Sequence, residues 1–147
     1  MYKIILLLHV LAATVWVGGH LVLALTVLPR ALRERSPAEL LRFEGGYEKI
    51  GMPALLIQVA TGLWLAHALV PDFRAWFAGG VPFAHLILLK LSLLAATLLL
   101  AADARLRIIP RLSPETLPVL ARRIVLVTFV SVLFVVTGVA FRTGSLL

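Results

Sequence analysis

The 147-residue chain contains no cysteine, and acidic residues are missing from each of its long apolar runs. The first absence excludes disulfides, thiolate metal sites and iron–sulfur clusters. The second argues against a proton-driven transporter built on membrane-embedded carboxylates. No dinucleotide-binding, P-loop or H-E-x-x-H metalloprotease motif occurs, so the common soluble enzyme signatures are also excluded.

Charged residues are scarce: 14% of the chain is charged, 61% is hydrophobic, and the mean hydropathy is +1.04. A soluble domain of this length needs more polar surface, so the composition indicates an integral membrane protein. The formal net charge is +7. This charge lies at the ends of apolar segments, where it orients a membrane protein, and it is therefore not read as a sign of nucleic-acid binding.

Four apolar segments are long enough to cross a ~30 Å hydrocarbon core as helices. The predicted spans, within one membrane domain covering 1–147, are 4–28, 50–70, 82–102 and 120–141. The fold class is therefore predicted to be an all-α, four-transmembrane-helix bundle in the lipid bilayer. Between the first two spans, Ser36-Pro37 with Glu39 matches a helix start with a capping box. We expect a short amphipathic helix there, either on the membrane surface or continuous with the second span.

The links between spans differ in charge. Five basic residues follow the first span and five follow the third: Arg30, Arg33, Arg35, Arg42 and Lys49, then Arg105, Arg107, Arg111, Arg122 and Arg123. The second link has only Arg74, beside Asp72. Because Lys and Arg accumulate in cytoplasmic loops, this pattern predicts both termini on the outer, periplasmic side of a bacterial inner membrane.

Histidines within the spans are the candidate ligands. His9 is expected about 8 Å below the outer boundary, at 1.5 Å per residue, and His67 and His85 are expected near the same boundary on two other helices. These three are the candidate metal ligands. His20 lies eleven residues after His9, on the same helix face but past the midplane. An alternative interpretation is that His67 and His85 are solvated at the interface and that His20 bonds a carbonyl group.

Lys90 is the most informative charged residue, because a lysine near a helix centre costs at least ~2.5 kcal/mol on insertion scales. It is a candidate partner for a haem propionate, an anionic substrate or a backbone carbonyl. Neutral imidazole binds haem iron, copper and zinc, so two functions remain open: redox chemistry at a haem b, and copper handling or transport across the membrane through the same histidines. A third alternative is a membrane subunit without a metal. Six further polar residues are expected to form hydrogen bonds between helices: Gln58, Thr61, Thr97, Thr128, Ser131 and Thr137.

Several stretches resemble a known family. The first span contains Leu8-His9-Val10-Leu11-Ala12-Ala13 and Val15-Trp16-Val17-Gly18-Gly19, the second contains Thr61-Gly62-Leu63-Trp64-Leu65, and the third contains Leu89-Lys90-Leu91. These features resemble the CopD (copper resistance protein D-like) family. They are also similar to HemJ-type protoporphyrinogen oxidases, in which a first-helix histidine and a third-helix lysine are functional.

The matching positions in this chain are His9 and Lys90. Leu28-Pro29-Arg30 comes several residues later than the equivalent HemJ motif, and His20 is additional. The resemblance implies a four-helix fold and favours haem b over copper. The expected function is therefore that of a membrane oxidoreductase, with an electron donor such as a quinol or a redox protein and possible assembly as a homo-oligomer. His9, His67, His85, Lys90 and His20 are the predicted cofactor-binding residues.

Overall fold

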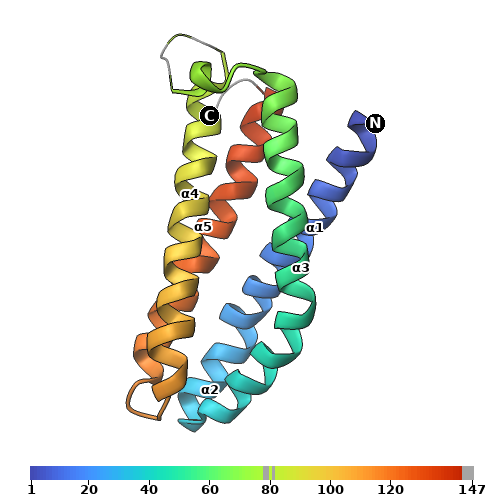
Figure 1. Cartoon of the computed structure of the whole chain (residues 1–147). Helices are drawn as coiled ribbons and strands as arrows, with labels where there is room; N and C mark the ends of the chain where they lie inside the picture. Colours follow the sequence, from blue (N-terminus) through green and yellow to red (C-terminus); the bar gives the residue numbers. More distant parts are fainter. Residues whose placement is uncertain (78–79, 81, 144–147) are drawn as a thin grey trace.

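The computed structural model describes residues 1–77, 80 and 82–143, and the described part contains helices and no strand (Figure 1). Four helical passes are long and apolar enough to cross a membrane: Tyr2–Glu34, Pro37–Leu69, Ala84–Arg111 and Leu117–Phe141. This confirms the predicted all-α fold with four membrane-length helices. The chain is therefore a multi-pass membrane protein.

The first pass does not end at Pro29, the residue at which the apolar run closes. Helix α1 (Tyr2–Val22) continues through a π-helical turn, η1 (Leu23–Val27), into α2 (Leu28–Glu34). Pro29 has no N–H group to close a bond with the preceding turn, and the wider turn lies immediately before it. The pass ends at Arg35, which has a left-handed backbone (φ 50°).

The second pass is one helix, α3 (Pro37–Leu69), and its interior includes Pro53. The amphipathic segment predicted between the first two spans is therefore continuous with the second span. The predicted capping box does not form, because the Ser36 side chain makes no capping hydrogen bond. Glu39 instead accepts a hydrogen bond from Arg30 of α2 at 2.9 Å.

The third and fourth passes are joined at the arginine-rich end of the molecule. Helix α4 (Ala84–Asp103) runs into a π-helical turn, η3 (Ala104–Ile108), and a 3₁₀ turn, η4 (Ile109–Arg111). Helix α5 (Leu117–Thr143) then runs back along the bundle as the fourth pass. At this end Arg123 of α5 donates to Asp103 of α4 at 2.8 Å, and Arg105 lies 2.9 Å from Glu48 of α3. At the opposite end a 3₁₀ turn, η2 (Phe73–Trp76), is fixed by Trp76, whose indole N–H donates to the Val70 carbonyl at 2.8 Å.

The helices pack mainly as two pairs, α1 with α3 and α4 with α5, and α1 also contacts α5. Figure 1 shows that the N-terminal end of α1 diverges from α4 and α5, while both ends of the described chain lie at the end of the bundle that carries η2. Ile4 and Leu7 in this part of α1 are 64% and 57% exposed, as expected of side chains in contact with lipid. Which membrane face this end occupies stays a prediction.

Within the described residues the apolar core forms three clusters along the bundle axis. The cluster at the arginine-rich end is the largest and includes Leu28, Leu40 and Leu117. The central cluster comprises Trp16, Val17, Leu55 and Val127. The cluster at the terminal end comprises Val70, Trp76 and Ile87. The interior between the central and terminal clusters is not purely apolar, and the candidate site lies there.

Candidate functional site in the bundle interior

His9 is held from α3. Its Nδ1 lies 2.9 Å from Oγ1 of Thr61, and the Thr61 hydroxyl donates to the Ile57 carbonyl at 2.6 Å. Because that hydroxyl proton is already used, Nδ1–H of His9 is the donor to Thr61. The second ring nitrogen, Nε2, then keeps its lone pair. A histidine oriented by a hydrogen bond at one nitrogen has the geometry of a metal ligand at the other.

Gly62 provides the space that the His9 ring occupies. A Cβ atom at Gly62 would lie 3.1 Å from Cε1 of His9, closer than ordinary van der Waals contact. The absence of a side chain thus permits the ring to approach the α3 backbone. Thr61 and Gly62 together fix the position and the tautomer of His9.

Lys90 approaches the interior from α4 and lies against α5. Its Nζ is 5.3 Å from the centre of the Phe141 ring and would be 3.6 Å from a Cβ atom at Gly138. The side chain is half-buried. Among the described residues no carboxylate forms an ion pair with it, and its ammonium group makes a cation–π contact with the Phe141 ring.

His9 and Lys90 lie close enough to interact electrostatically. We call His9, Thr61, Gly62, Lys90 and Gly138 the His9–Lys90 layer. All four helical passes contribute to it, and it lies between the central and terminal apolar clusters. It combines an imidazole with a free lone pair, an uncompensated ammonium group and two glycines, and this combination suits a ligand that offers both a Lewis-acidic atom and an anionic group.

His20 occupies a different environment near the middle of the bundle. Its Nδ1 donates to the Trp16 carbonyl at 2.8 Å, as the carbonyl-bonding alternative anticipates, although the carbonyl belongs to its own helix. The centre of the His20 ring lies 4.5 Å from that of the Trp16 ring and 5.7 Å from that of the Tyr47 ring, which it meets edge-on. The Tyr47 hydroxyl donates to the Trp16 carbonyl at 3.0 Å. His20 is therefore part of a packed aromatic group, separate from the His9–Lys90 layer.

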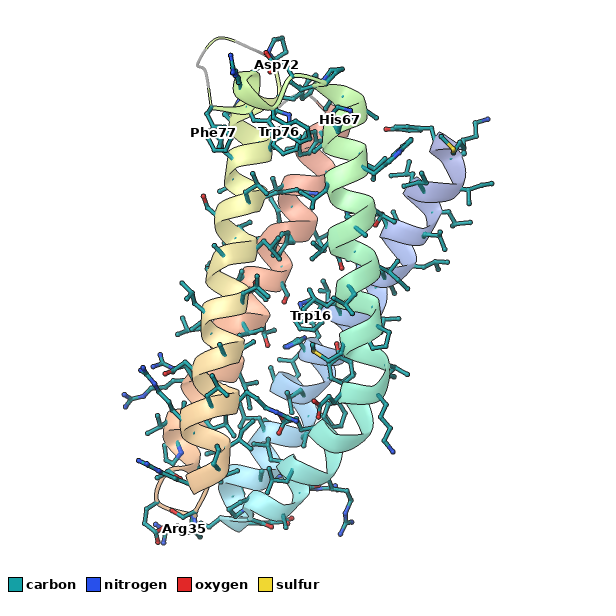
Figure 2. The ribbon with its side chains drawn as sticks, in the orientation of Figure 1. Trp16, Arg35, His67, Asp72, Trp76 and Phe77 are labelled. Carbon is teal, nitrogen blue, oxygen red and sulfur yellow. The ribbon has the colours of Figure 1, made fainter. Side chains whose placement is uncertain are left out.

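His67 and His85 lie at the terminal end and are exposed. His67 stacks on Phe73 of η2 at 5.1 Å and lies beside the Trp76 turn (Figure 2). Within the described ranges no group of three metal-binding side chains comes together. The predicted three-histidine set of His9, His67 and His85 is therefore not assembled in the described part of the chain; His67 and His85 are exposed near helix ends, whereas His9 is half-buried.

Sequence reasoning missed two features of the site. Thr61 forms the expected hydrogen bond between helices, but the sequence did not identify His9 as its partner. Tyr47 was not among the candidate site residues, although its ring fits between Gly19 of α1 and Gly51 of α3. The sequence contains Gly62 beside Thr61, and Gly19 and Gly51 on two different helices. Matching these residues with His9 and Tyr47 requires the register between α1 and α3, which the sequence does not show.

The family comparison agrees with the resemblance seen in the second and third spans. The family model for CopD, copper resistance protein D, matches residues 41–142, which is more than half of the chain. This range contains Lys90, His67 and His85, whereas His9 and His20 precede it. No curated protein and no solved structure matches the chain. The chain therefore belongs to the CopD (copper resistance protein D) family of membrane proteins.

Proposed function

We propose that this protein is a membrane redox protein that binds one b-type haem, with His9 as its axial ligand. The observation that supports the proposal is the Thr61 bond to Nδ1 of His9, which leaves the Nε2 lone pair of this half-buried histidine free. A single proximal histidine suffices to hold haem iron. When bound, the haem would supply one-electron transfer, and the protein would supply the ligand, its orientation and the surrounding charge.

The positive charge of Lys90 favours a ligand that carries an anionic group. An ammonium group at membrane depth without a carboxylate partner is costly unless a ligand compensates its charge, and a haem propionate is such a ligand. The glycines at 62 and 138 let the His9 ring and the Lys90 ammonium group lie close to the backbones of α3 and α5. The HemJ-type likeness rests on the same two side chains and stays a hypothesis. His67 and His85 are exposed, so this proposal uses one axial histidine and does not need either of them.

The electron partner would be a quinol from the bilayer or a redox protein at the membrane surface. The charge pattern of the links supports the bacterial inner membrane, with the His9–Lys90 layer toward the periplasm. The exposed apolar side chains of the N-terminal half of α1 are compatible with lipid contact and with contact to a second copy of the chain.

Copper as cargo is the second candidate, and the family match is the observation that favours it. His9 and His20 each donate from Nδ1, which leaves Nε2 free on both rings, and they are about 16 Å apart at 1.5 Å per residue along one helix. The positive charge of Lys90 opposes a copper ion at His9. Removal of that charge should therefore strengthen copper binding, whereas it should weaken haem binding.

The deciding experiment is an absorbance spectrum of the detergent-purified protein before and after dithionite reduction, with iron and copper measured on the same sample. We expect a Soret band that shifts on reduction and iron in proportion to the chain. His9→Ala should lose the band, and His67→Ala is the matched histidine control that should keep it. A colourless protein with stoichiometric copper would favour the transport function. A protein that binds neither after reconstitution would indicate a metal-free membrane subunit.

A spectrum that disappears in His67→Ala and in His85→Ala but persists in His9→Ala would refute the assignment of His9. Thr61→Val should keep the haem and alter its spectrum or its midpoint potential, because the axial ring loses its orienting bond.

A further inference from the structure

Three buried polar atoms in the centre of the bundle have no hydrogen-bond partner among the described residues: Nε1 of Trp16, Oε1 of Gln58 and Oγ of Ser131. Trp16 is 7% exposed and Ser131 is completely buried. A buried polar group left unpaired is destabilising, because its lost hydrogen bonds to water are not replaced. Native structures usually satisfy such groups with bound water.

The three atoms come from three helices and lie at the same level. Trp16 packs with Leu55 of α3 and Val127 of α5 in the central apolar cluster. Gln58 is three residues after Leu55 and Ser131 is four residues after Val127, so both lie one helical turn nearer the terminal end. The Trp16 side chain also points that way, because helical side chains tilt toward the N-terminus of their helix. Trp16 lies near the middle of the bundle (Figure 2).

The chemistry of the three atoms is complementary to water. The Trp16 indole can only donate, the Gln58 amide oxygen can only accept, and the Ser131 hydroxyl can do either. A molecule that accepts from Trp16 while it donates to Gln58 satisfies both, and water does this. A metal ion would meet an N–H donor at Trp16, which cannot ligate it.

We propose that Trp16, Gln58 and Ser131 bind ordered water at the centre of the membrane span. This site lies one turn inward of the His9–Lys90 layer, since the Thr61 hydroxyl that holds His9 lies 3.3 Å from the Gln58 backbone carbonyl. The inference does not depend on haem or copper, and it holds if His9 binds neither.

The test is the behaviour of tryptophan indole protons in the ¹⁵N-labelled full-length protein in nanodiscs, by nuclear magnetic resonance. We expect a cross-peak between water and the Trp16 indole proton. The internal control is Trp76, which is 3% exposed and whose N–H is bonded to the Val70 carbonyl. We expect the Trp16 indole proton to exchange with deuterium at least tenfold faster than that of Trp76. Trp16→Phe assigns the signal.

Ser131→Val should remove the water cross-peak and slow Trp16 exchange at least tenfold, because methyl groups replace the hydroxyl. Ser92→Ala is the matched control, since the Ser92 hydroxyl bonds the Leu88 carbonyl on the exposed side of α4. If Ser131→Val does not fold, Gln58→Leu replaces it, and the same loss of the water cross-peak and slower exchange of the Trp16 indole proton are expected. A wild-type Trp16 signal without a water cross-peak, or one that exchanges no faster than Trp76, overturns the proposal.

Discussion

Replacement of Lys90 by methionine should stabilise the metal-free protein while it impairs ligand binding. Lysine at a helix centre costs about 2.5–3.5 kcal/mol relative to an apolar residue on insertion scales. The contact of Nζ with the Phe141 ring at 5.3 Å returns about 1 kcal/mol of that cost. Because the side chain is only half-buried, the net gain in the free energy of unfolding should be about 1–2 kcal/mol.

The assay is reversible unfolding of the metal-free protein in mixed micelles, with helicity followed against denaturant. Lys49→Met is the matched control, because Lys49 is exposed on α3 near the charged end, and its effect should lie within about 0.5 kcal/mol of zero. In parallel, haem titration of Lys90→Met should show weaker binding than that of the wild type. The reasoning fails if Lys90→Met lowers the stability of the metal-free protein by about 1 kcal/mol or more, since Lys90 would then be part of the structural core.

Two further predictions concern the packing that positions the site. Gly19→Ala should destabilise the protein by about 1–3 kcal/mol, because its methyl group would overlap the Tyr47 ring. Gly18→Ala should be neutral or stabilising in the same unfolding assay, because nothing lies within 4 Å of its added methyl. Asp103→Asn should cost about 0.5–1 kcal/mol through its 2.8 Å bond to Arg123. That cost should shrink at high salt, and a cost that does not depend on salt would exclude an electrostatic origin.

The number of membrane passes and their helical character could be predicted from apolar length alone. Their ends could not: the apolar run ends at Pro29, but the helix continues to Glu34, because a wider turn accommodates the missing N–H of proline. A hydropathy profile records side chains and contains no information on such backbone adjustments.

The site was predictable in part. His9 and Lys90 were identified because polar groups in a membrane need partners, and the structure brings them into one layer. The assignment of Thr61 and the exposure of His67 and His85 depend on helix rotation. Rotation is set by contacts such as Tyr47 between Gly19 and Gly51, which join distant parts of the sequence, so a single sequence does not show them.

The π-helical turn before Pro29 has a consequence for variation in chain length. Leu23 and Leu28 are both buried, at 7% and 4% exposure, although residues five apart on an uninterrupted α-helix point about 140° away from each other. The wider turn thus carries one residue more than an α-turn and keeps both leucines in the core. A relative that lacks one residue between these positions would form a regular α-helix with the same buried faces, whereas a deletion between His9 and Leu23 would rotate His9 by about 100° relative to the packed part of the pass and away from Thr61.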